Sequence, residues 1–160
     1  MRMTDNLPGI LYVRTFGGFS VTYNGKIIAG GSKASDSQMD NLLMILLHHR
    51  QTGAARDRIE EILFGDREIS NVHHALQSVI YNTKKKLGRM GIPDADTCIR
   101  QEKSIFYWSS SVPVIEDSEE FIKIFGEAYE TDDTDERLAL LSEAVHWYSG
   151  EFLPVQTAVT

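Results

Sequence analysis

Amide and basic side chains gather in the stretch from residue 74 to residue 89. Gln77 and Asn82 carry side-chain amides, which can form two hydrogen bonds with the edge of an adenine. The basic residues of the stretch can neutralise phosphates or pair with a guanine edge. These residue types together favour nucleic-acid recognition. The face that would carry it contains His74, Gln77, Ser78, Tyr81, Asn82, Lys84, Lys85 and Arg89.

Two other segments contain candidate phosphate contacts, one after this stretch and one before it. Arg100 and Lys103 lie on an expected β-hairpin, where they would reach a nucleic-acid backbone. Residues 30–33, Gly-Gly-Ser-Lys, lead into the first expected helix, whose free N–H groups would hold a phosphate. The candidate contacts are therefore spread over a helix, a turn and a helix start.

Patterns typical of enzymes and metal sites are missing from the sequence. It has no GxxxxGK[ST] motif, no nucleophile elbow and no metal-binding histidine spacing. The acidic run 132–135 lacks the glycine and the distal Glu of a calcium loop, so a turn with a helix cap explains it better. Cys98, the single cysteine, cannot form an internal disulfide and is expected in the core. We expect no enzyme activity, no metal and no cofactor.

Charge is divided unevenly along the 160 residues. The net charge is −7, but residues 1–108 contain 14 Lys and Arg against 11 Asp and Glu, whereas residues 109–160 contain 2 against 12. Such asymmetry indicates two units with separate tasks, and we place the boundary at three consecutive serines, 109–111. The first unit is the one suited to a polyanion.

Nothing in the sequence indicates a membrane partner. The longest apolar run, residues 42–47, is too short to cross a bilayer. The first eight residues lack the apolar stretch of a secretion signal, so we expect a cytoplasmic protein.

The first thirty residues predict a small antiparallel sheet. Residues 10–15 and 19–23 have the mixed apolar and polar pattern of short strands. Asn24 and Gly25 follow, a pair that favours a two-residue hairpin because both positions take a positive φ. Residues 26–28 would return as a third strand.

Two helices are expected next. The first should begin near Ser35, which has capping-box spacing to Gln38, and run until Gly53. The second should begin at Asp57 and end at residues 65–66. The apolar residues that these helices would bury are Met39, Leu42, Leu43, Leu46, Leu47, Ile59, Ile62 and Leu63.

A third, longer helix and a β-hairpin complete the first unit. Ser70 or Asn71 can cap the helix. Residues 98–100 and 105–108 are expected as strands, joined by the polar turn 101–104. The stripe that the third helix would bury is Val72, Leu76, Val79, Thr83, Leu87 and Met90.

The acidic unit predicts a helical hairpin. One helix should span residues 118–129 and the next residues 134–149, with Gly150 as its stop. Two helices alone cannot cover their apolar faces, so we expect the native protein to continue with further helices. The residues expected to be buried are Phe121, Ile122, Phe125, Tyr129, Leu138, Leu141, Val145 and Tyr148.

This order of elements predicts an α+β fold: a winged helix-turn-helix with a small N-terminal sheet, three helices and a β-hairpin wing, followed by an α-helical hairpin. A winged helix presents its third helix to the major groove, which is about 12 Å wide, while the wing reaches the backbone or minor groove. The polar face of residues 74–89 fits that task.

Five motifs occur in a fixed order along the chain: TFGGF at 15–19, YNGK at 23–26, LQSVIYNTKKKLG at 76–88, IRQEK at 99–103 with Tyr107, and YSGEFLP at 148–154. Together they resemble the motifs of the antibiotic-regulatory-protein (SARP) family of bacterial regulators. The resemblance implies an OmpR-like winged-helix domain in residues 1–108 and, in residues 109–160, the first hairpin of a tetratricopeptide-like bacterial transcriptional activation domain, cut short.

The resemblance also implies partners. Such a regulator, typically an activator, binds double-stranded promoter DNA, often as a homodimer on direct repeats, and contacts RNA polymerase. The sequence departs from the family pattern at Asn82, where arginine is common, and at Lys84 and Lys85, where arginines are usual. Because lysine lacks the two-pronged guanidinium, phosphate binding suits these lysines better than base reading.

Two alternatives remain open at the level of sequence. The small positive balance of residues 1–108 suits a winged helix that binds protein instead of DNA. The acidic residues 109–160 could fold over the basic helix and inhibit it.

Overall fold

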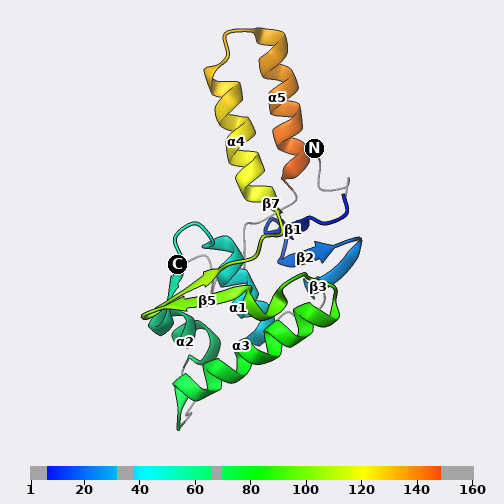
Figure 1. Ribbon diagram of the computed structural model, residues 1–160. Helices are drawn as coiled ribbons and strands as arrows, with labels where there is room; N and C mark the ends of the chain where they lie inside the picture. The colour runs from blue at the N-terminus through cyan, green and yellow to red at the C-terminus, as the bar shows by residue number, and fades with distance from the viewer. Residues whose placement is uncertain (1–6, 32–37, 66–69, 149–160) are drawn as a thin grey trace.

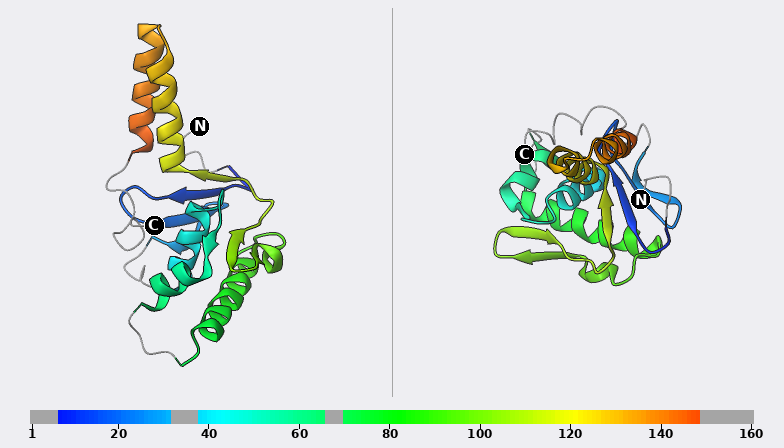
Figure 2. Two further views of the ribbon diagram at one scale, coloured as in Figure 1. Left: turned by 90° about the vertical axis from the view of Figure 1, so that its left-hand side faces the viewer. Right: turned by 90° about the horizontal axis from the view of Figure 1, so that it is seen from above.

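The computed structural model describes residues 7–31, 38–65 and 70–148 (Figure 1). A mixed body of helices and strands carries a helical hairpin that stands away from it (Figures 1 and 2). Within the described ranges, no helix is both long and apolar enough to cross a membrane. The strands are β1 (Leu11–Arg14), β2 (Ser20–Tyr23), β3 (Lys26–Gly30), β4 (Ala54–Ala55), β5 (Ile99–Glu102), β6 (Ile105–Trp108) and β7 (Val114–Glu116). The helices are α1 (Gln38–His48), α2 (Arg56–Phe64), α3 (Val72–Arg89), α4 (Asp117–Glu130) and α5 (Thr134–Trp147), with a 3₁₀ turn at Ala95–Thr97.

The N-terminal sheet contains the predicted meander and one strand more. β2 turns into β3 at Asn24 and Gly25, whose φ angles are 51° and 79°, which confirms the hairpin. β7 lies parallel to β1, so the strand order is β3-β2-β1-β7. The sequence does not indicate β7, because three residues are too few to show an alternating pattern. Residues 114–116 thus belong to this sheet although they follow the proposed domain boundary at 108/109. The boundary itself stays a prediction.

α1 is the central helix of the body. It contacts β3, α2, α3 and β6, and all its residues from 42 to 47 are buried. The expected start at Ser35 lies outside the described residues. The expected end at Gly53 is wrong: the helix ends at His48, and the N–H groups of Thr52 and Gly53 then bond to the carbonyl of His49 in a turn.

α2 matches its prediction within one residue. It begins at Arg56 and is capped by Gly65, and it buries Ile59 and Leu63, while Ile62 is half-buried. Asp66, the other residue of the expected stop, lies outside the described residues. α2 and α1 together support one side of α3.

The second sheet has the order β4-β6-β5. The predicted four-residue turn 101–104 is wrong, because Gln101 and Glu102 pair with β6 and leave a two-residue turn at Lys103 and Ser104. β4 is a further strand that the sequence does not indicate. It follows Gly53, where an added Cβ would lie 2.6 Å from the ring of Tyr107, so β4 can reach β6 only past a residue without a side chain.

α4 and α5 form the predicted helical hairpin, but a different side of it is buried. Ile124 packs against Ala144 and Trp147, with Phe121 and Leu140 partly buried beside them, and Ala128 is buried as well. α5 ends at Trp147 instead of residue 149, and Gly150 lies outside the described residues. Most of the apolar residues expected to be buried are exposed instead, with exposed fractions of 43–80%: Ile122, Phe125, Tyr129, Leu138, Val145 and Tyr148.

The hairpin and α3 lie at opposite ends of the molecule. α3 runs along the underside of the body, whereas α4 and α5 rise from its top (Figures 1 and 2). The described part of the acidic unit therefore does not fold over the basic helix, contrary to the inhibitory arrangement considered from the sequence.

Candidate nucleic-acid interface

Packing against the core fixes the orientation of α3. Its cap is Asn71, whose side-chain oxygen accepts the N–H of His74 at 3.0 Å. Of the predicted stripe, Leu76, Val79, Thr83 and Leu87 are buried, together with Ile80, whereas Val72 and Met90 are only half-buried. The Thr83 hydroxyl donates to the Val79 carbonyl at 2.7 Å, so this polar group is satisfied inside the core. The polar residues between these positions are left on the outer side.

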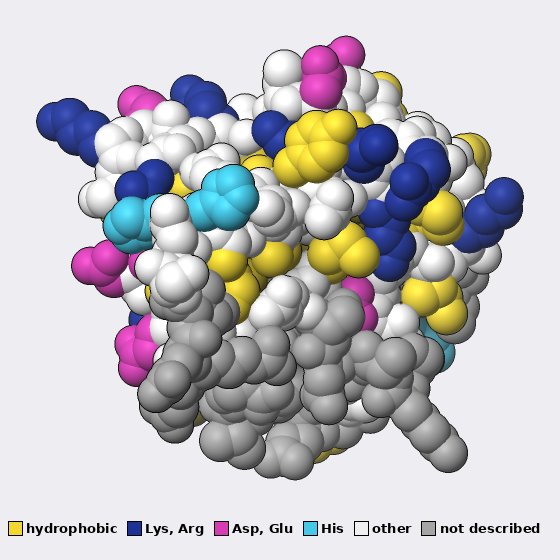
Figure 3. Space-filling model, turned by 90° about the horizontal axis from the view of Figure 1, so that it is seen from below, with side chains coloured by type: hydrophobic (Ala, Val, Ile, Leu, Met, Phe, Trp, Pro, Cys, Tyr) yellow, Lys and Arg dark blue, Asp and Glu magenta, His cyan; other side chains and the backbone are white. Residues whose placement is uncertain are grey.

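The structure brings the eight predicted helix residues together on the outer side of α3. Seven of them are exposed, and Lys84 is half-buried. Figure 3 views this underside and shows Lys and Arg side chains gathered on it, with hydrophobic side chains between them. The surface combines amides, which both donate and accept hydrogen bonds, with cations and an aromatic ring.

Tyr81 and Lys85 form a pair at the centre of this surface. The ammonium of Lys85 lies 5.6 Å from the centre of the Tyr81 ring, one helical turn away. The ring is 60% exposed. The contact restricts where the lysine ammonium can lie before any ligand arrives.

The β5–β6 hairpin presents its two predicted residues at the surface. The Arg100 guanidinium lies 5.3 Å from the centre of the Tyr107 ring and 3.2 Å from the carboxylate of Glu102. Lys103 occupies the turn with a φ of 56°, and its carbonyl accepts from the Gln101 amide at 2.7 Å. Arg100 is therefore held in place, with part of its charge balanced by Glu102.

The two flanks of α3 differ in charge. A hollow of about 500 Å³ on one flank is lined by Lys84 and Lys85 but also by Asp94 and Asp96. Asn82, Lys85 and Arg89 line a hollow of about 430 Å³ on the other, whose described lining includes no acidic side chain. The second flank is therefore the more favourable one for a phosphate.

The predicted phosphate site before α1 is only partly described. Gly30 and Gly31 take positive φ angles of 64° and 74°. Ser32 and Lys33 lie outside the described residues, so a phosphate contact there stays a prediction.

Cys98 and His73 have structural surroundings. Cys98 is fully buried, as expected, and burial raises the pKa of its thiol to about 11, so it stays protonated at neutral pH. His73 pairs with Glu60 at 2.5 Å, which ties α3 to α2. No group of three or more His, Cys, Asp or Glu in the described ranges is placed to hold a metal ion.

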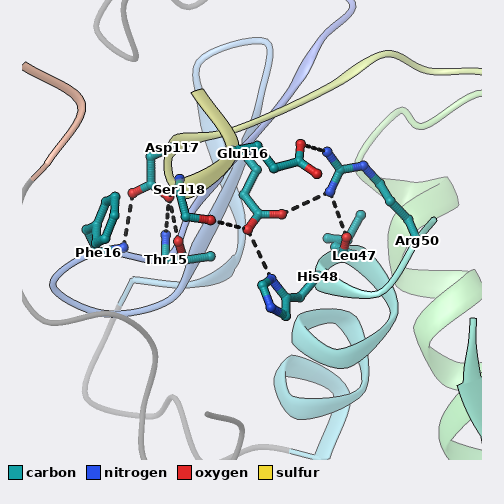
Figure 4. A network of polar contacts seen from close by, with 9 residues as sticks. Thr15, Phe16, Leu47, His48, Arg50, Glu116, Asp117 and Ser118 are labelled. Atoms are coloured by element: carbon teal, nitrogen blue, oxygen red, sulfur yellow. Dashed lines mark hydrogen bonds and ion pairs between the residues drawn. The ribbon is translucent and has the colours of Figure 1, made fainter. Parts of the chain in front are cut away.

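Glu116 joins the helical hairpin to α1, a role that sequence reasoning missed (Figure 4). Its carboxylate bonds to the His48 ring at 3.0 Å, the Arg50 guanidinium at 2.9 Å and the Ser118 hydroxyl at 2.5 Å. Burial by itself would raise the pKa of Glu116, but these hydrogen bonds outweigh it and hold the pKa below its ordinary value. Arg50 also bonds to Glu119 in the first turn of α4.

Asp117 joins the hairpin to the two residues that follow β1 (Figure 4). Its carboxylate accepts the Thr15 N–H at 2.8 Å, the Thr15 hydroxyl at 2.6 Å and the Phe16 N–H at 3.0 Å. Burial raises the pKa of Asp117 above its ordinary value despite these bonds. The partners lie about a hundred positions away in the chain, so no local pattern could have revealed them.

Comparison with known proteins shows the fold. No protein-family model and no curated protein matches the sequence. The fold resembles that of EmbR. This Mycobacterium tuberculosis protein, solved in complex with a low affinity phosphopeptide, superimposes with a TM-score of 0.71 at 18% sequence identity. The match covers 89% of this chain but 37% of the EmbR chain, so the chain spans just over a third of its length.

The likeness to EmbR supports the mixed α+β fold predicted from the sequence. It extends over most of the chain and so includes both the body and part or all of the helical hairpin. At this level of identity it concerns the fold alone. The roles of individual residues therefore depend on the surface described above.

Proposed function

We propose that the chain is a transcription regulator that binds double-stranded promoter DNA. α3 enters the major groove with its exposed face, and the β5–β6 hairpin acts as the wing and contacts the backbone. One observation carries the proposal: α3 buries an apolar stripe in the core while amides, cations and a tyrosine cover its other side. A helix divided in this way offers base-reading groups to a groove about 12 Å wide.

Base reading and phosphate binding fall to different residues in this proposal. Gln77 and Asn82 read base edges, since their amides donate and accept. Lys84 and Lys85 bind phosphates, as do Arg100 and Lys103 on the wing. His74, Ser78, Tyr81 and Arg89 complete the contact surface.

The wider organisation follows the SARP resemblance. We propose that residues 1–108 correspond to an OmpR-like winged-helix domain and residues 109–160 to the first hairpin of a bacterial transcriptional activation domain. The regulator would act in the cytoplasm, bind direct repeats as a homodimer and activate RNA polymerase. The EmbR-like fold supports this organisation, because it covers both parts of the chain.

Selection from a random duplex library with the purified chain, followed by binding titrations, tests the proposal. Lys85→Ala should weaken binding to every duplex and lower the slope of log K against log salt by about 1. Gln77→Ala or Asn82→Ala should cost about 1–3 kcal/mol on the selected site and much less on other sequences. Lys123→Ala, which removes an exposed lysine of α4, is the control and should change neither quantity.

Two results would count against this function. Selection that enriches no sequence would remove the claim of specific readout. Absence of binding to any duplex at low salt would remove DNA binding altogether.

A winged helix that binds protein is the second candidate. The acidic residues Asp94, Asp96 and Glu102 beside the predicted contacts favour it, because each would repel a phosphate. In that case, Lys85→Ala, Gln77→Ala and Asn82→Ala would leave the duplex titrations at low salt unchanged.

A further inference from the structure

Tyr81 differs from the other aromatic residues of the body. Of the Phe, Tyr and Trp residues that the structure describes between residues 7 and 116, it is the one that is exposed, with an exposed fraction of 60%. It lies two positions from both Val79 and Thr83, which are buried, so its ring lies on the opposite side of α3. The ring therefore belongs to the surface that α3 would place against DNA.

The neighbours of Tyr81 put its ring in the middle of that surface. Ser78 comes one turn before it and Lys85 one turn after it, and all three residues are exposed. The Lys85 ammonium lies over the ring, 5.6 Å from its centre, which restricts where the ring can lie. In a helix that lies in the major groove, the middle of the outward face meets the edges of the bases, whereas the flanks meet the two backbones.

The hollow beside Tyr81 is a poor place for a phosphate. Tyr81 lines the hollow of about 500 Å³, together with Lys84, Lys85, Asp94 and Asp96. The two carboxylates offset the charge of the two lysines and repel an anion. An uncharged group on the base edges therefore suits the ring better than the DNA backbone does.

One group in the major groove matches an aromatic ring. Guanine, adenine and cytosine present hydrogen-bond donors and acceptors there, whereas thymine presents its C5-methyl group beside an acceptor. Gln77, one turn before Tyr81, carries an amide that suits adenine. An A·T pair presents the adenine edge and the methyl group in the same groove, so one such pair or two neighbouring ones can meet both residues.

We infer that Tyr81 is a specificity-determining residue of the proposed DNA site and that its ring packs against the C5-methyl group of a thymine. The inference rests on the proposed function and names one base of its target. It requires an A·T pair opposite the middle of α3. The contact belongs to the ring and not to the hydroxyl group of the tyrosine.

Replacement of thymine by uracil tests the inference, because uracil pairs in the same way and lacks only the C5-methyl group. The probe is the duplex that selection with the 160-residue chain yields, with each of its thymines replaced singly. At the thymine that Tyr81 contacts, we expect uracil to weaken binding by about fourfold, which is what the burial of one methyl group contributes.

Variants of Tyr81 assign the methyl contact to its ring. Tyr81→Ala should bind the thymine and uracil duplexes equally at that position. Tyr81→Phe should retain the difference of about fourfold, because it keeps the ring and loses only the hydroxyl group. Both variants should keep the unfolding transition, since the side chain is exposed. Tyr129→Ala is the matched control: it removes an exposed tyrosine of α4, at the other end of the molecule, and should change neither the affinity nor the difference (Figure 1).

Three results would overturn the inference and leave the proposed function standing. In the first, the chain selects a specific duplex in which no replacement of thymine by uracil weakens binding. In the second, Tyr81→Ala keeps the difference between thymine and uracil, so that another residue contacts the methyl group. In the third, Tyr81→Phe loses the difference, so that the hydroxyl group reads the base. Absence of duplex binding, or selection that enriches no sequence, would overturn the proposed function and this inference with it.

Discussion

Arg100 on the β5–β6 hairpin shares its charge with a neighbour. Glu102 lies 3.2 Å away, and both side chains are more than half exposed. A phosphate approaching Arg100 meets that carboxylate as well. Glu102→Gln should therefore tighten duplex binding, by about threefold if the pair is worth the usual amount for exposed charges.

Titrations of the native chain and the Glu102→Gln variant against one duplex, at low and at high salt, check this prediction. Glu127→Gln removes the same charge from α4 at the far end of the molecule and should leave the affinity unchanged. Equal or weaker binding by the Glu102→Gln variant would show that the hairpin does not approach the phosphates.

Single residues differ in how far the sequence reveals them. The types and spacing of residues 74–89 predict a polar face. The structure exposes that face because the apolar residues, three and four positions apart, pack the opposite side of the helix into the core. Glu116 and Asp117 give no such sign. In the sequence they are two acids at a helix start, and their structural role depends on partners just after β1 and just after α1 that come together only in the fold.

At the scale of the element, the start of α3 offers a direct test. The sequence allows Ser70 or Asn71 as the cap, and the structure selects Asn71 through its bond to the His74 N–H. Asn71→Ala should lower the free energy of unfolding by about 1 kcal/mol, since the helix loses that bond. Ser70→Ala is the control and should change it by less than about 0.5 kcal/mol. Urea unfolding of both variants measures the difference, and equal losses would contradict the assignment.

Elements with a strong local period are predicted well, and those defined by distant partners are not. The Asn24–Gly25 hairpin and the stripe of α3 follow from local rules of turns and helices. The two short strands β4 and β7 exist because β6 and β1 offer them unpaired edges. In the α4–α5 hairpin, each helix has apolar residues on two sides, and the side that is buried, with Ile124, Ala144 and Trp147, depends on the pairing of the two helices and not on a local pattern.

At the scale of the whole molecule, Glu116 makes stability depend on pH. Its folded pKa lies below the ordinary value of 4.5, so its contribution is fully present above pH 4.5 and is lost as the pH falls through the folded pKa. Asp117 acts in the opposite sense: its pKa is raised above 3.8, so its contribution is present below that pH and is lost as the pH rises through the folded pKa.

Glu116→Gln should therefore destabilise the chain mainly near neutral pH. We expect a loss of about 3 kcal/mol at pH 7, because the largely buried Arg50 loses its buried partner and keeps only the exposed Glu119. The difference in stability between the variant and the native chain should become smaller as the pH falls below 4.5. Thermal unfolding at several pH values measures this, with Glu119→Gln, at the exposed partner of Arg50, as the milder control. A loss that is independent of pH would show that the carboxylate does not act through its charge.

The junction also determines where the chain can be shortened. Ending it at residue 108 removes β7, Glu116 and Asp117, which leaves the N–H groups of Thr15 and Phe16 without their acceptor. Each orphaned group costs about 1–3 kcal/mol if it stays buried. Ending the chain at residue 120 keeps these contacts. Fragment 1–120 should therefore show a cooperative unfolding transition at a clearly higher temperature than fragment 1–108.

The same two fragments test whether the hairpin affects DNA binding. Most of α4 and all of α5 are missing from fragment 1–120, yet both stand at the far end of the body from α3 (Figure 2). Distant sites with no shared contacts rarely couple by more than about 0.5 kcal/mol, so fragment 1–120 and the whole chain should bind a duplex within about twofold of each other. Tighter binding by the fragment would mean that the acidic hairpin acts on α3 through its charge or by moving toward it. Weaker binding by fragment 1–108 alone would follow from its lower stability, because α3 is held in place by the same core that β7 completes.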